Sequence, residues 1–180
     1  RLHSLQMPLV RPFRTSFGTQ YVRDVMLVEA IDSDGAQGWG ECVTLGWPGY
    51  NAEYTAGAIQ VIKEYLAPIV LGNDWTPDGV HAAMKVVRGH HIARASVGTA
   101  VLDVWLRRAS TSLGDYLGAT RAEVDCGVSV GIPTSESIED LLEEVGMYVD
   151  AGYRRIKLKI EPGWDIEPVA VVRERWPTIP

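Results

Sequence analysis

The sequence predicts an α+β domain over residues 1–122, followed over residues 123–180 by two βα units with parallel strands. In the first part, segments with strand character come before segments with helix character, which is typical of an α+β domain. From residue 124 onward, short apolar segments alternate with amphipathic ones across short loops, which is typical of βα units. The chain has 180 residues, whereas a complete (β/α)8 barrel has about 250. We therefore expect any barrel to be incomplete in this chain.

The first part begins with three predicted strands, at residues 2–10, 22–31 and 37–43. The second is the strongest, because its centre consists of apolar residues that favour strands. Residues 32–35, Asp-Ser-Asp-Gly, are a turn signal that joins the second and third strands as a hairpin. Residues 11–19 are predicted to form a loop that holds both phenylalanines of the chain. Their rings either tuck under the loop or form a lid over a ligand.

Three helices are predicted to follow these strands. The first has Asn51 as its N-cap and ends at Pro68, and the second begins at Thr76 with proline at the first helical position. Gly98 lies within the third helix and indicates close packing there, since glycine is unfavourable inside a helix. The third helix covers residues 92–109, and its predicted buried positions are Ala95, Thr99, Leu102, Trp105, Leu106 and Ala109.

The second part has the order strand, helix, strand, helix. The strands are predicted at residues 124–132 and 154–160. Thr134 or Ser135 is the expected N-cap of the first helix, whose apolar residues recur with helical spacing, and the second helix covers residues 165–175. Because the loops are short and a helix lies between the strands, the two strands should run parallel.

Charge and composition exclude several classes of protein. There are 17 Lys and Arg residues against 23 Asp and Glu, a net charge of −6, whereas a general nucleic-acid-binding protein carries a basic surface. No apolar run approaches the ~20 residues of a membrane span, and the N-terminus lacks the apolar core of a signal peptide. Cys42 and Cys126 do not have the spacing of a redox or zinc motif. We expect buried free thiols, a cytoplasmic location, and neither nucleic acid nor membrane as a partner.

Two short motifs are weak matches to known functional motifs. Gly38-Trp39-Gly40 begins like a dinucleotide fingerprint but lacks the third glycine and does not open a helix, so a tight hairpin strand explains it better. Gly127-Val128-Ser129-Val130-Gly131 matches the nucleophile elbow of α/β-hydrolases. That elbow needs a sharp turn at the serine and a later histidine, yet valines flank Ser129 and no histidine follows it. A serine hydrolase is therefore not expected.

Lys157-Leu158-Lys159 is the most informative motif. In a strand, alternate residues point to the same side, so Lys157 and Lys159 project together, with their side-chain origins roughly 6.5–7 Å apart. The simplest interpretation is an edge strand with its charged face in water. However, parallel strands are usually covered on both faces, which would turn the lysines toward a barrel interior or cleft. Two ammonium groups held this close disfavour each other's charge, and a neutral lysine is a competent general base. Barrel chemistry lies at the carboxyl ends of strands, and Lys159 is nearer that end.

Five segments carry a family resemblance over essentially the whole chain. They are Met-Pro-Leu-Val at 7–10, Pro-Phe-Arg-Thr-Ser-Phe-Gly at 12–18, Gly-Trp-Gly-Glu-Cys-Val at 38–43, Cys-Gly-Val-Ser-Val-Gly-Ile at 126–132 and Arg-Ile-Lys-Leu-Lys-Ile-Glu-Pro-Gly-Trp-Asp at 155–165. With these segments the chain resembles the muconate-lactonizing-enzyme-like branch of the enolase superfamily, and within it the N-acylamino acid racemase / o-succinylbenzoate synthase family. The last segment is the most specific.

The resemblance implies a capping α+β domain, residues 1–122, and the first two βα units of a (β/α) TIM-type barrel, residues 123–180. Family members abstract the proton α to a carboxylate and hold the enediolate with Mg²⁺. The resemblance implies that Lys159 is the base and that Lys157 orients it and stabilises the carboxylate charge. It also implies that Ser129 lines the substrate site and that Phe13 and Leu45 lie in capping-domain loops that close over the substrate.

The metal ligands implied by the family lie on the third, fourth and fifth barrel strands, beyond residue 180, so no metal ligand is expected in this chain. Glu161 and Asp165 follow the second strand as loop and cap residues and are not expected to substitute for them. We expect the N-terminal portion of a racemase or synthase that acts on a small carboxylate, is inactive by itself, and is a homo-oligomer when complete. The alternatives are a dipeptide epimerase, a muconate cycloisomerase, or a non-catalytic binding or assembly fragment.

Overall fold

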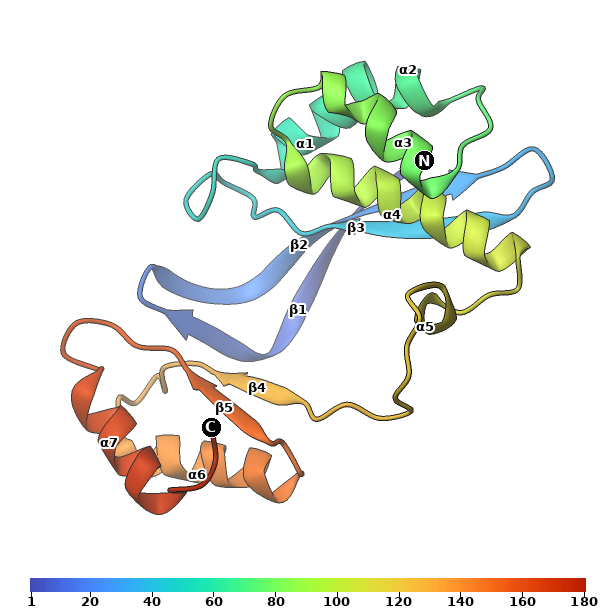
Figure 1. Cartoon of the computed structure of the whole chain (residues 1–180). Coiled ribbons are helices and arrows are strands. Elements are labelled where there is room, and N and C mark those ends of the chain that lie inside the picture. The colour runs from blue at the N-terminus through green and yellow to red at the C-terminus, as the bar shows by residue number, and fades with distance from the viewer. The chain divides into compact units, whose positions relative to one another are not determined.

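The structure, a computed structural model, describes residues 1–180 and has a mixed α/β fold with two compact units (Figure 1). The first unit contains Arg1–Met7 and Val22–Thr120, and the second contains Pro8–Tyr21 and Arg121–Pro180. Residues 8–21, the tip of the first hairpin, thus pack with the C-terminal part of the chain. The domain limits given above, 1–122 and 123–180, remain a prediction.

Three strands form one sheet in the order β1-β2-β3: β1 (Leu2–Thr15), β2 (Gly18–Ile31) and β3 (Gln37–Cys42). β2 and β3 are antiparallel, as predicted, and the carboxylate of Asp32 accepts two backbone N–H groups in the turn between them. The predicted loop over residues 11–19 is wrong, because β1 continues to Thr15 and β2 starts at Gly18. A connection of two residues leaves no room for a loop, and the extended backbone of both strands satisfies its N–H and C=O groups by pairing.

The helices of the first unit follow β3. They are α1 (Thr55–Val61), the π-helical turn η1 (Ile62–Leu66), α2 (Ala67–Val70), α3 (Pro77–Ala83), the 3-10 turn η2 (Met84–Val86), α4 (His91–Arg108) and α5 (Leu113–Tyr116). The Thr76 cap of α3 is confirmed, since its side chain accepts the N–H of Gly79 at 3.1 Å.

Two predicted boundaries of the first helix are wrong. Its N-cap is Tyr54, while Asn51 instead accepts the N–H of Glu53 at 2.8 Å in a local turn. Pro68 lies inside the helical segment rather than at its end. A proline lacks an N–H and its ring presses on the carbonyl four residues before it. The wider π turn just before Pro68 accommodates both effects, so the helix continues.

The core of the first unit lies between its sheet and its helices, and its largest fully buried side chains are Met26, Leu66, Met84 and Val80. The predicted buried face of α4 is largely wrong, because Ala95, Thr99 and Ala109 are exposed and Trp105 is 39% exposed. The residues of α4 that are buried are Ala93, Ser96, Val97, Gly98, Ala100, Val104 and Leu106. Small residues face the sheet because β3 presents glycines there, which lets the helix approach closely.

The second unit contains β4 (Gly127–Val130), α6 (Ile138–Asp150), β5 (Arg155–Leu158) and α7 (Ile166–Arg175). β4 and β5 are parallel, which confirms the predicted order and direction of these elements. The N-cap of α6 is Ser137 rather than Thr134 or Ser135, and Ser135 instead donates a hydrogen bond to the carboxylate of Asp140. The core cluster of this unit consists of Val130 from β4 and of Leu141 and Val145 from α6.

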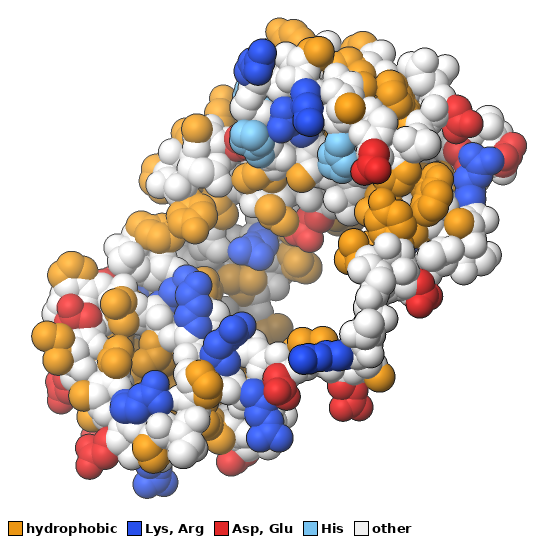
Figure 2. All heavy atoms as spheres, viewed as in Figure 1, with side chains coloured by type: hydrophobic (Ala, Val, Ile, Leu, Met, Phe, Trp, Pro, Cys, Tyr) orange, Lys and Arg blue, Asp and Glu red, His pale blue; other side chains and the backbone are white.

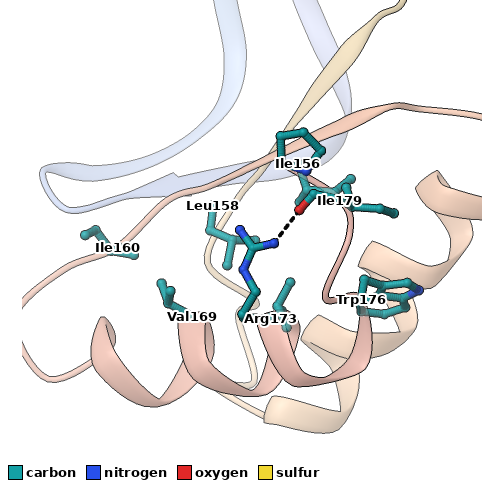
Figure 3. Close-up of a pocket in the computed structure, with 9 residues that line it drawn as sticks. Ile156, Leu158, Ile160, Val169, Arg173, Trp176 and Ile179 are labelled. Atoms are coloured by element: carbon teal, nitrogen blue, oxygen red, sulfur yellow. Dashed lines mark hydrogen bonds between the residues drawn. The ribbon is translucent and has the colours of Figure 1, made fainter.

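The apolar side of β5 faces α7 across a cavity of about 220 Å³ (Figure 3). Ile156 and Leu158 line it from β5, and Val169 and Arg173 line it from α7. Arg173 donates a hydrogen bond to the carbonyl of Ile179 at 2.7 Å, which holds the last residues against this cavity. The lysines of this segment alternate with these apolar residues and therefore project to the opposite side of β5.

The two thiols differ in environment. Cys42 is buried in the core, and this burial raises its pKa. Cys126 is exposed, so the expectation that both thiols are buried is wrong for it. Cys126 lies in the connection just before β4. None of the helices combines the length and the apolarity that a membrane span would require.

Candidate functional site

Ser129 and Lys157 are direct neighbours across the β4–β5 pair. They are register partners in the parallel ladder, so their side chains project from the same face of the two-stranded sheet. Both residues are exposed. The sheet therefore places a hydroxyl group and an ammonium group side by side on the face opposite the apolar cavity.

Lys159 extends this group to the carboxyl end of β5. The strand ends at Leu158, two residues earlier than predicted, but the N–H of Lys159 still donates to the carbonyl of Val130 at 2.9 Å. The backbone ladder therefore continues one residue past the strand, and the alternation of side chains places Lys159 on the same face as Lys157. Lys159 is half-buried, whereas Lys157 is exposed.

Phe13 covers the end of this lysine pair. The ammonium nitrogen of Lys159 lies 5.8 Å from the centre of the Phe13 ring, within the range of a cation–π contact. Phe13 is half-buried and belongs to β1, in the part of the hairpin that packs with the second unit. A Cβ atom at Gly131 would lie 3.5 Å from the Phe13 ring and 3.4 Å from the carbonyl of Arg14. The hairpin thus comes close to the end of β4.

Arg14, the next residue, was not identified from the sequence. One of its guanidinium nitrogens lies 2.7 Å from a carboxylate oxygen of Glu136 and 2.7 Å from one of Glu161. The hydrogen bond to Glu136 is the main reason why the pKa of Arg14 is raised, and partial burial opposes it. No local sequence signal identifies this group, because Arg14 lies more than 100 positions from either glutamate along the chain.

Leu45 lies in the first unit. It forms an isolated bridge with Tyr54, and its carbonyl accepts the N–H of Thr55 at 2.9 Å. Ser129, Lys157, Lys159 and Phe13 belong to the second unit, so the structure brings these four together. The role of Leu45 at a substrate site stays a prediction.

The chain has no group of three or more His, Cys, Asp and Glu residues that could hold a metal ion. The two carboxylates that follow β5 in the sequence before α7 have other partners. Glu161 pairs with Arg14, and Asp165 caps α7 by accepting the N–H of Ile166 at 2.9 Å. The residues present therefore do not fit a divalent cation, and no chemical step can be assigned to one within this chain.

The arrangement places Lys157 and Lys159 on one face of the sheet. Two neighbouring cationic side chains attract an anionic group such as a carboxylate. Figure 2 shows further Lys and Arg side chains on the visible face of this unit, although the chain as a whole is acidic. The serine hydroxyl and the phenyl ring supply a hydrogen-bonding group and an apolar cover.

The chain is similar to known proteins over its full length. Residues 2–118 match the family model described as mandelate racemase / muconate lactonizing enzyme, N-terminal domain. The chain is 51% identical to an N-succinylamino acid racemase of Amycolatopsis sp, over 97% of this chain and 47% of that protein. It is 38% identical to an o-succinylbenzoate synthase of Geobacillus kaustophilus, over 99% of this chain and 48% of that protein.

The chain is also similar in fold to a solved structure over nearly all of its length. An enolase-superfamily member from Listeria innocua superimposes with a TM-score of 0.89 at 35% identity, over 99% of this chain and 48% of that one. The chain therefore spans about half the length of the curated relatives it matches.

Proposed function

Because the chain belongs to the mandelate racemase / muconate lactonizing enzyme family of the enolase superfamily, we propose that it is the N-terminal portion of an enzyme that abstracts the proton α to a carboxylate. The reactions we propose are racemisation of an N-acylamino acid and synthesis of o-succinylbenzoate. These are the activities after which two relatives, 51% and 38% identical to this chain, are named.

The lysine pair at the carboxyl end of β5 is the observation that carries this proposal. Residues at the carboxyl ends of parallel barrel strands are where barrel enzymes place their chemistry. In the proposed reaction the neutral amine of Lys159 removes the α-proton, the C–H electron pair moves into the carboxylate as an enediolate, and Lys159 becomes an ammonium ion. Lys157 stays charged, orients Lys159 and stabilises the negative charge that develops on the substrate.

The other predicted residues form the surroundings of the substrate in this proposal. Ser129 lines the floor of the site beside Lys157, and Phe13 covers the substrate from the hairpin. We also propose that Leu45, in the first unit, contacts the substrate. The reaction also calls for a divalent cation, Mg²⁺ in our proposal, which supplies charge stabilisation to the enediolate when bound. We place its ligands in the half of the relatives that this chain does not match.

The test is exchange of the substrate α-proton with D₂O, followed by NMR on the full-length protein that carries this chain. Removing a general base typically lowers a rate by about 10²–10⁴-fold, so Lys159→Ala should reduce exchange by at least the lower figure. Lys85→Ala is the matched control, because Lys85 is exposed on η2 of the first unit and has no role in the proposal. Exchange that persists in Lys159→Ala would exclude Lys159 as the base.

The choice of substrate separates this proposal from its alternatives. An N-succinylamino acid and the precursor of o-succinylbenzoate should both be offered, beside a dipeptide and a muconate. Turnover of the dipeptide or the muconate alone would show that the chain belongs to an epimerase or a cycloisomerase instead.

A further inference from the structure

We propose that Arg14 is a positioning residue that fastens the tip of the β1–β2 hairpin to the loops after β4 and β5, and so holds Phe13 over Lys159. The geometric part of this inference stands on contacts within the second unit. Its catalytic consequence rests on the proposed function above.

The guanidinium group of Arg14 joins two loops that are far apart in sequence. Glu136 lies between β4 and α6, and Glu161 lies between β5 and α7, so each carboxylate follows the carboxyl end of one of the two parallel strands. A single nitrogen of Arg14 lies 2.7 Å from both carboxylates. The side chains of Arg14 and Glu161 are each only 23% exposed, so water screens this pair less than it screens an ordinary surface ion pair.

The backbone of Arg14 supports the same attachment. Its carbonyl accepts the N–H of Ile132, the second residue after β4, at 3.2 Å. The hairpin passes directly beside Gly131, since a Cβ atom there would be in van der Waals contact with the backbone of Arg14, 3.4 Å from its carbonyl oxygen. The hairpin tip is thus bound to the end of β4 by its backbone and to both loops by one side chain.

The conformation of Glu136 fits this role. Its φ angle is +52°, in the left-handed region that residues other than glycine rarely adopt. Such a backbone persists only where surrounding contacts hold it, and these positions cluster at functional sites. The ion pair with Arg14 is one such contact, and it directs the loop after β4 toward the hairpin.

A loosened hairpin should affect substrate binding more than the chemical step. If only a fraction of molecules has the hairpin in place, the apparent dissociation constant rises by the inverse of that fraction. Molecules that do bind substrate still carry Lys159 and Lys157. We therefore expect Arg14→Met to raise KM by about three- to tenfold and to change kcat by less than about threefold.

The first measurement is hydrogen–deuterium exchange of the hairpin in the full-length protein, which does not depend on activity. Arg14→Met should speed exchange in residues 8–21 by about three- to tenfold and leave α4 unchanged. Arg11→Met is the matched control in the same strand, since Arg11 is exposed and its contact with the sulfur of Met147, at 3.8 Å, is weak. Arg14→Lys keeps the charge and should restore part of the protection.

The second measurement is a mutant cycle that identifies the partners of Arg14. Glu136→Gln combined with Glu161→Gln should reproduce the faster exchange, and adding Arg14→Met to that background should add little. If Arg14→Met leaves hairpin exchange unchanged, or has the same effect with and without the two carboxylates, the proposal is wrong. If the wild-type protein does not exchange the substrate α-proton, the proposed function fails. The amide hydrogen–deuterium exchange of residues 8–21 still decides whether Arg14 holds the hairpin.

Discussion

Glycine residues decide how closely helix α4 approaches strand β3. A Cβ atom at Gly40 would lie 1.9 Å from the carbonyl oxygen of Ser96, and one at Gly38 would lie 2.3 Å from the backbone nitrogen of Val104. On the other side of α4, the ring of His81 from α3 packs directly on Gly98, since a Cβ atom there would lie 2.4 Å from this ring. From the sequence, Gly38 and Gly40 indicated only a tight hairpin strand. The prediction of close packing at Gly98 is confirmed.

Gly40→Ala should therefore destabilise the protein. The added methyl group meets backbone atoms of α4 that cannot rotate away, so we expect a loss of about 2–3 kcal/mol in the free energy of unfolding. Urea titration of the variant and the wild type measures this difference. Gly114→Ala is the control, because its Cβ atom would meet only side-chain atoms at 3.6 Å or more. Equal stability of the two variants would contradict the close approach.

At the scale of elements, the N-terminus of α4 is capped from another part of the chain. Its N-cap residue, His90, has a left-handed backbone (φ +46°) and makes no side-chain cap. The carboxylate of Glu53 instead accepts the N–H of Ile92 at 3.0 Å and that of Ala93 at 3.1 Å. A negative charge at this end also interacts favourably with the helix dipole. Glu53 thereby ties the segment that follows β3 to the longest helix of the structure.

Glu53→Gln should weaken this end of α4, because a neutral amide is a poorer acceptor and interacts less with the dipole. We expect a loss of about 1 kcal/mol in the free energy of unfolding, as for other lost caps. Thermal or urea unfolding measures it. Glu64→Gln is a suitable control, since Glu64 is exposed and bonds only to the Gln60 side chain. A variant at Glu53 no less stable than the control would show that the cap contributes nothing.

At the scale of the whole molecule, the chain contains a lysine pair but no group of residues that could hold a metal ion. Lys159 and Phe13 lie in the second unit, while Leu45 lies in the first. In the reaction proposed above, charge stabilisation of the enediolate would come from residues outside this chain, because the lysine pair alone lacks the partner that makes proton abstraction favourable.

We accordingly predict that a protein of residues 1–180 alone exchanges no substrate α-proton. Excess Mg²⁺ should leave its Tm unchanged, since a ligand stabilises a fold only by binding to it. The full-length protein in the same assays, with Mg²⁺ and after its removal by EDTA, provides the comparison. Exchange activity or a rise in Tm with Mg²⁺ in the 180-residue protein would contradict the proposal that the metal ligands lie elsewhere.

Local patterns were sufficient to predict much of the architecture and part of the site. The three strands of the first sheet, the order and parallel pairing of β4 and β5, and the Thr76 cap follow from spacings of a few residues. The same is true of Lys157 and Lys159, whose spacing of two places them on one face of a strand. Such patterns are informative because they depend on backbone geometry that repeats every two to four residues.

The tertiary structure alone decided the features that depend on distant partners. The buried face of α4 follows the glycines of β3, the cap of α4 comes from Glu53, and Arg14 meets carboxylates more than 100 positions away. The sequence by itself determined the family, the two βα units and the lysine pair, because each can be recognised from residues that are close together in the sequence. Packing in the folded protein decided which surfaces meet. Close approach and charge pairing each depend on two segments at once, so neither segment shows them by itself.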